Sequence, residues 1–176
     1  MIPSVPWPSE RHALKCELAD EVLRSAGCLR LRVMGWSMLP GVWPGDVLVI
    51  DRATSQQVSK GDIILFRRDR RLFVHRVVGK DGEHAGAAVL TRGDALLEPD
   101  PPVSNNDVLG KVSLILRNGQ TIEPRRSLRI FERAIAVLVQ RSDMAARIVV
   151  SLHNVRQTPR TAPSSTCENR AVPCQS

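Results

Sequence analysis

The chain has 176 residues, 43% of them hydrophobic, which is enough for one domain with a hydrophobic core. Its 25 basic and 18 acidic residues give a formal net charge of +7. No stretch of about 18 apolar residues is present, and the first residues lack both a basic flank and an apolar core, so the sequence indicates neither a transmembrane helix nor a signal peptide. We therefore expect a cytoplasmic protein.

Histidine and cysteine are too scattered to predict a metal centre. The chain has four of each, and no two cysteines form a C-x-x-C pair. Metal sites in proteins usually show such short ligand spacings. We expect neither a metal ion nor another cofactor. The cysteines are Cys16, Cys28, Cys167 and Cys174.

The first predicted element is a helix from Ser9 to about Ala26. Ser9 is a suitable N-cap, and Gly27 is a typical residue just beyond a helix end. Apolar residues recur with helical spacing and are expected to form the buried face. These residues are Leu14, Leu18, Val22 and Leu23.

Short strands follow the helix. Alternation of apolar and basic residues predicts a strand over 29–34. Short segments next to turn residues predict further strands over 46–50, 62–66, 72–78, 88–91, 108–116 and 121–122. Arg68-Asp69-Arg70 and Asn118-Gly119 predict hairpin turns, and the arginine-rich residues 67–71 are expected to form a solvated hairpin tip. The pattern predicts a mainly β domain with a helix at each end.

Four segments are expected along the chain: a helical lead over 1–28, a β domain over 29–123, a C-terminal helix over 124–153 and a disordered tail over 154–176. From Arg117 onward ten arginines stand against four acidic residues. Such a helix can contact an anionic membrane surface, although a solvated charged face is the simpler interpretation. Nucleic acid is not an expected partner.

The segment Gly35-Trp36-Ser37-Met38-Leu39-Pro40 is the first with catalytic potential. A serine hydroxyl becomes a nucleophile when a nearby base accepts its proton. In a sharp turn, the backbone N–H groups around Gly35, Ser37 and Met38 can face a developing oxyanion. The structural alternative is an ordinary turn serine.

His75 is the candidate base. It lies in the predicted strand Phe73-Val74-His75-Arg76-Val77-Val78, where alternation places Phe73, His75 and Val77 on one face. An imidazole in a partly desolvated cleft can accept a proton from a serine. The structural alternative is a core histidine with a satisfied ring.

Two later acids, Asp94 and Asp100, are candidates to orient His75. A carboxylate that binds one ring nitrogen holds the imidazole in the useful tautomer. The sequence leaves open which of the two does so, and an Asx-turn at a strand end is the alternative for Asp94. Arg76 is expected to point away from His75 and to pair with a structural acid: Asp94, Asp46 or Asp62. The last two acids each follow a glycine at a strand start and are expected to form turns.

Taken in order, these fragments resemble the signal peptidase I family and the related LexA-like self-cleaving repressors. The resemblance covers about Val33 to Lys111 and is closest to the archaeal, endoplasmic-reticulum and sporulation-type branch, in which the base is histidine. The matching fragments are Gly35-x-Ser37-Met38-x-Pro40, Gly45-Asp46-Val47-Leu48-Val49, Gly61-Asp62-Ile63-Ile64-x-Phe66, His75-Arg76-Val77-Val78, Thr91-Arg92-Gly93-Asp94 and Asp100.

The resemblance implies a compact, coiled all-β domain with Ser37 as nucleophile and His75 as base. It also implies that Asp94 and Asp100 occupy the positions of the two acids in the Gly-Asp…Asp segment of that branch. It also implies a serine endopeptidase that cleaves precursor peptides or proteins next to small side chains. The alternative is a LexA-like self-cleaving or regulatory module with little turnover on other substrates.

Two features depart from the family pattern. Members that process preproteins carry membrane-spanning segments, and this sequence indicates none. Either the protein contacts the membrane peripherally, through the basic C-terminal helix, or its substrate is not a secreted precursor. Some members also have a hydroxyl two residues before the nucleophile, where this chain has Gly35. An oxyanion would then depend on backbone N–H groups.

Overall fold

The computed structural model describes residues 8–82 and 87–127. Within them the chain forms one α-helix, α1 (Pro8–Ala26), one short 3-10 helix, η1 (Asn105–Asp107), and seven strands. The strands are β1 (Cys28–Arg32), β2 (Val47–Arg52), β3 (Ile63–Arg68), β4 (Arg71–Asp81), β5 (Ala88–Arg92), β6 (Val108–Arg117) and β7 (Gln120–Ile122). The mainly β fold and its N-terminal helix are thus confirmed, whereas most of the predicted C-terminal helix and the whole predicted tail lie outside the described residues.

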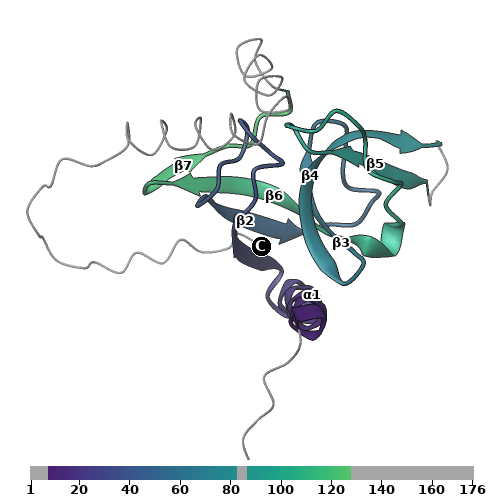
Figure 1. Cartoon of the computed structure of the whole chain (residues 1–176), viewed down its shortest axis with the longest axis horizontal. Coiled ribbons are helices and arrows are strands. Elements are labelled where there is room, and N and C mark those ends of the chain that lie inside the picture. The colour runs from purple at the N-terminus through teal and green to yellow at the C-terminus, as the bar shows by residue number, and fades with distance from the viewer. Residues whose placement is uncertain (1–7, 83–86, 128–176) are drawn as a thin grey trace, which may run out of the picture.

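All strand pairs are antiparallel, in the order β1-β2-β6-β3-β4-β5, with β7 also paired to β6. Register shifts interrupt the pairing at Val49/Ile50, at Leu65/Phe66 and between Val77 and Gly79. Such bulges bend strands and increase twist. Figure 1 shows the result, with β2 and β6 on one side of the fold, β4 and β5 on the other, and α1 beneath them.

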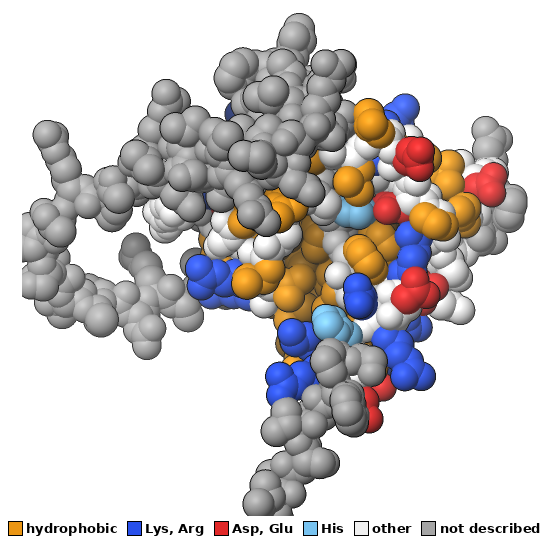
Figure 2. Space-filling view, in the orientation of Figure 1, with side chains coloured by type: hydrophobic (Ala, Val, Ile, Leu, Met, Phe, Trp, Pro, Cys, Tyr) orange, Lys and Arg blue, Asp and Glu red, His pale blue; other side chains and the backbone are white. Residues whose placement is uncertain are grey.

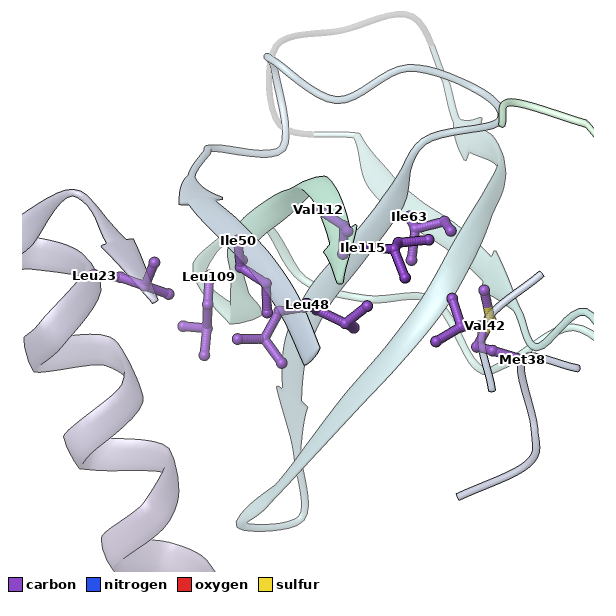
Figure 3. Close-up of a cluster of buried hydrophobic side chains, with 10 residues drawn as sticks. Leu23, Met38, Val42, Leu48, Ile50, Ile63, Leu109, Val112 and Ile115 are labelled. Carbon is purple, nitrogen blue, oxygen red and sulfur yellow. The ribbon is translucent and has the colours of Figure 1, made fainter. Parts of the chain in front are cut away.

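Two apolar clusters lie on opposite faces of β3. Its sequence Ile63-Ile64-Leu65-Phe66 is apolar without alternation, and successive side chains of a strand point to opposite faces. Ile63 and Leu65 join the first cluster, and Ile64 and Phe66 join the second. Figure 3 shows the first cluster, which extends from Leu23 of α1 to Met38 and Val42. The second cluster also contains Val58, Val77, Val89, Val103 and Val108. β3 is therefore buried on both sides.

The buried face of α1 differs from the predicted one. Leu14 and Leu18 are 60% and 61% exposed, whereas Cys16, Ala19 and Leu23 are buried. The buried residues follow the i, i+3, i+7 spacing of a helix face. The prediction was wrong for Leu14 and Leu18 and correct for Leu23.

Both predicted hairpin turns are present. Asp69 and Arg70 have φ values of 49° and 59° and form a two-residue loop between the paired Arg68 and Arg71. Asn118 and Gly119, at 50° and 77°, do the same between β6 and β7. Positive φ at both loop residues is the pattern of a type I′ turn, whose twist suits a hairpin.

The arginine cluster at the first hairpin is not simply solvated, which corrects the prediction for residues 67–71. Arg67 Nε donates to Asp107 Oδ1 at 3.0 Å, and its Nη1 lies 3.7 Å from Asp20 of α1. Arg68 interacts with the loop that contains Asp100. These two side chains fix the hairpin against η1, α1 and the loop, and leave residues 69–71 exposed.

The two Gly-Asp pairs form turns, as predicted. Asp46 Oδ2 accepts a hydrogen bond from the backbone N–H of Trp43 at 2.8 Å, and Asp62 Oδ2 accepts one from Ser59 at 3.0 Å. Asp46 also pairs with Arg117 at the end of β6. These turns set the starts of β2 and β3.

Candidate active site

Ser37 lies in the turn between β1 and β2, directly before a buried apolar segment. Met38, Leu39 and Val42 are at most 2% exposed. Backbone hydrogen bonds from Leu39 to Trp36 and from Val42 to Met38 close the turn. Burial of the residues after the serine anchors the turn in the first apolar cluster and fixes the place of the Ser37 hydroxyl.

Ser37, His75 and Asp100 form a continuous hydrogen-bonded series. His75 Nε2 lies 3.1 Å from Ser37 Oγ, and His75 Nδ1 lies 2.6 Å from Asp100 Oδ2. A carboxylate accepts hydrogen bonds, so the network assigns the ring proton to Nδ1 and leaves Nε2 to accept from the serine hydroxyl. The structure therefore brings together three predicted residues that are far apart in the sequence.

The imidazole of His75 lies in a largely apolar setting. The ring centroids of Phe66 and Phe73 are 5.9 and 6.1 Å from it, and His75 is only 4% exposed. In the β3–β4 register, His75 is opposite Ile64 and Phe73 is opposite Phe66. The predicted face of β4 that carries Phe73, His75 and Val77 is confirmed, since it packs with the second apolar cluster.

Asp100 is held from several directions. Thr91 Oγ1 donates to its Oδ2 at 2.7 Å, and the backbone N–H of Asp100 donates to the Thr91 carbonyl at 2.8 Å. Burial alone would raise the pKa of Asp100, but hydrogen bonds from His75 and Thr91, together with the charges of His75 and Arg68, lower this pKa below its ordinary value. The carboxylate is therefore ionised at neutral pH.

Asp94, the other candidate, contacts Arg76 instead of His75. Its two carboxylate oxygens accept hydrogen bonds from Arg76 Nε and Nη2, both at 2.7 Å. The side chains are 10% exposed for Arg76 and 4% for Asp94. Arg76 thus pairs with a structural acid, as expected, and of the two open candidates Asp100 is the one that meets the imidazole.

The loop after β5 packs against the nucleophile turn. The backbone N–H of Ala95 donates to the Ser37 carbonyl at 2.9 Å, and a Cβ at Gly93 would lie only 2.6 Å from that oxygen. The backbone N–H groups of Ser37 and Met38 make no hydrogen bond with any described residue. A Cβ at Gly35 would meet nothing within 4 Å. The turn therefore carries backbone N–H groups without partners among the described residues, and open space at Gly35.

A cleft of about 460 Å³ opens at Ser37 and His75. Residues 31–35, at and after the end of β1, line it together with the first half of β4, residues 71–75. Helix α1 contributes His12 and Lys15. Figure 2 shows this face, with apolar side chains at its centre and Lys and Arg side chains gathered near α1.

Sequence reasoning gave no role to Thr91 and Arg68. Thr91 belongs to one of the fragments that carry the family resemblance, but nothing in the local pattern shows that its hydroxyl would meet Asp100. Arg68 was assigned to the solvated hairpin tip, although its Nη1 lies 4.0 Å from Asp100 Oδ1. Both contacts depend on the loop between Arg92 and Asp100 turning back on β5.

The described residues contain neither a metal cluster nor a membrane-spanning helix. Over residues 8–82 and 87–127, no three His, Cys, Asp or Glu side chains gather closely enough to hold a metal ion. Nor does this part of the chain contain a helix with the length and hydropathy needed to cross a bilayer.

A serine, a histidine and a carboxylate in series at a cleft on a β fold are the elements of a serine peptidase site. Residues 6–85 match the family model described as Peptidase S24-like. The matched segment contains Ser37 and His75 and ends before Asp94. It supports a place in the LexA/S24 peptidase superfamily and, at this coarse level, a serine-type peptidase. No curated protein matches the chain.

Proposed function

We propose that this protein is a serine endopeptidase of signal-peptidase type that cleaves precursor peptides or proteins. Ser37 is the nucleophile, His75 the general base and Asp100 the residue that orients the imidazole. The observation that carries the proposal is the series of contacts from Ser37 Oγ to His75 Nε2, at 3.1 Å, and from His75 Nδ1 to Asp100, at 2.6 Å.

The reaction begins when Ser37 Oγ attacks the scissile carbonyl and His75 Nε2 takes the hydroxyl proton. The backbone N–H groups of Ser37 and Met38 stabilise the resulting oxyanion. His75 then gives the proton to the leaving amine, and the C–N bond breaks to leave an acyl-enzyme. Water releases the acyl group with His75 again acting as base. Asp100 stabilises the imidazolium and keeps the ring in place.

The cleft suits an extended peptide. Among residues 8–82 and 87–127, β1 pairs only with β2, and residues 71–75 of β4 pair only with β3, because β5 joins β4 from Arg76 onward. Two strand edges without partners among the described residues thus line the cleft that contains Ser37. Such edges can bind a peptide backbone by strand addition.

The test compares the wild-type protein with Ser37→Ala and His75→Ala on peptides with Ala-x-Ala junctions. Ser25→Ala, at the exposed end of α1, is the matched control for serine removal. We expect cleavage by the wild-type protein and the control, and at most residual cleavage by the two site variants. Equal cleavage by all four proteins would refute the assignment.

Self-cleavage is the second candidate, and the S24-like match is the observation that favours it. In this case the pure protein, incubated alone, yields two fragments by mass spectrometry, and Ser37→Ala yields none. An intramolecular reaction proceeds at a rate independent of protein concentration, whereas cleavage of one copy by another accelerates with concentration. The concentration series therefore separates cleavage within one chain from cleavage of one copy by another, and the Ala-x-Ala peptides report cleavage of other substrates.

A further inference from the structure

The cleft that contains Ser37 is lined by both apolar and basic side chains. Val33, Met38, Val42 and Phe73 belong to its apolar lining. Its lysine and arginine residues are Lys15 of α1, Arg32 of β1 and Arg71 of β4. Among the described residues that line the cleft, none is acidic.

These three basic side chains have no carboxylate partner among the described residues. Their neighbours Arg67 and Arg68, by contrast, pair with Asp20, Asp107 and Asp100. Lys15, Arg32 and Arg71 are all exposed. The positive charge of these three lining residues is therefore not neutralised within the described part of the fold.

Strand periodicity gives the distance from the reacting atoms. Side chains at every second position of a strand share one face, so Arg71, Phe73 and His75 lie on the same face of β4. Four residues of strand span about 13 Å. An extended peptide has nearly the same rise, so a peptide lying along β4 brings a side chain about four positions from its scissile bond to Arg71.

We propose that the preferred substrate carries an acidic side chain about four residues from the bond that is cleaved, where Arg71, Arg32 and Lys15 bind it. This inference rests on the proposed peptidase function and adds a determinant of specificity to it. Lysine and arginine at exposed positions bind a carboxylate modestly and in a salt-dependent way.

The experiment uses matched peptides with an Ala-x-Ala junction and either Glu or Gln four residues before or four residues after it. We expect kcat/KM to be about three- to tenfold higher for Glu than for Gln at one of these positions in low salt. The ratio falls toward one in high salt and in the double variant Arg32→Gln/Arg71→Gln. Arg52 is exposed on β2 and lies outside the cleft, so Arg52→Gln should retain the wild-type ratio of kcat/KM.

A binding measurement keeps the inference distinct from the proposed function. Labelled Glu and Gln peptides are titrated against Ser37→Ala and against Ser37→Ala/Arg32→Gln/Arg71→Gln, with fluorescence anisotropy as readout. Tighter binding of the Glu peptide that disappears in the triple variant supports the inference even if no peptide is cleaved. Failure of the peptidase proposal appears separately, as absence of cleavage that depends on Ser37.

Two outcomes would overturn the inference. One is a failure of the expected Glu preference: kcat/KM and binding are equal for Glu and Gln at both positions, or the preference for Glu is unchanged in Arg32→Gln/Arg71→Gln. The other is binding to vesicles of phosphatidylserine and phosphatidylcholine that needs Arg32 and Arg71, together with no discrimination between the peptides. That result would assign the basic residues to a membrane surface instead of a substrate.

Discussion

Arg76 and Asp94 form a two-point ion pair that connects the strand of the proposed base to the loop beneath the proposed nucleophile. Arg76 follows His75 in β4, and Asp94 precedes Ala95, whose N–H binds the Ser37 carbonyl. Arg76 Nη1 also donates to the Gly61 carbonyl at 2.8 Å. The pair therefore acts on Ser37 and His75 by position, without touching either side chain.

Removal of one partner should be costly, because the other charge is left buried. We expect Asp94→Asn to lower the free energy of unfolding by about 3 kcal/mol in urea denaturation. Asp107→Asn is the matched control, since its pair with Arg67 is about 40% exposed on both sides and should contribute less than about 1 kcal/mol. Equal stability of the two variants would show that the Asp94 pair does not hold the fold.

Asp100 should affect catalysis far more than stability. In Asp100→Asn the amide no longer favours a proton on His75 Nδ1, so Nε2 is not available to accept from Ser37. We expect kcat to fall by about 10⁴-fold, because loss of the orienting carboxylate from a Ser-His-Asp triad leaves the imidazole in the wrong tautomer. Thr91→Val, which removes a donor to Asp100 and not the carboxylate, should cause a smaller fall in kcat. A kcat for Asp100→Asn close to wild type would contradict the assigned role.

The lowered pKa of Asp100 predicts how stability depends on pH. Its pKa is lower in the folded protein than in the unfolded chain, where an aspartate has a pKa of about 3.9. The associated stabilisation is therefore present above about pH 4 and is lost as pH falls through the folded value. Urea denaturation of the wild-type protein and Asp100→Asn at pH 6 and pH 3 should show a smaller difference in the free energy of unfolding at the lower pH. A difference that grows on acidification would mean that the pKa is shifted the other way.

Gly93 is expected to tolerate no side chain. A Cβ there would lie 2.6 Å from the Ser37 carbonyl oxygen and 2.9 Å from Leu96, and the first of these atoms is backbone. We expect Gly93→Ala to lower the free energy of unfolding by about 1–3 kcal/mol and to reduce kcat, because the turn that holds Ser37 must shift. Gly35→Ala is the control for the free energy of unfolding only, since its Cβ meets nothing within 4 Å but Gly35 lines the cleft. Comparable losses in both variants would point to a general effect of replacing glycine near the site.

The features that could be predicted from the sequence are those set by local chemistry. Alternation and turn residues locate the strands, and Asp69-Arg70 and Asn118-Gly119 mark their hairpins correctly. The shared face of Phe73 and His75 follows from strand periodicity alone. Ser37 and His75 were placed in one site through the family resemblance, and their side chains indeed meet at 3.1 Å.

The features that could not be predicted depend on contacts between distant segments. Cys16 and Ala19 are buried in place of Leu14 and Leu18 because of how α1 lies against the sheet, which helical spacing does not specify. The choice between Asp94 and Asp100 depends on a loop that returns to β5, where Asp100 N–H binds the Thr91 carbonyl. No local pattern distinguishes the acid that meets Arg76 from the acid that meets His75.

The two apolar clusters on opposite faces of β3 have a consequence for the reacting pair. Ser37 precedes Met38, which is anchored in one cluster, and His75 lies on the face that packs with the other. The 3.1 Å distance between Ser37 Oγ and His75 Nε2 therefore depends on the relative position of the two apolar clusters. A small displacement of one cluster relative to the other would abolish hydrolysis, although the circular dichroism spectrum would still be that of a folded protein.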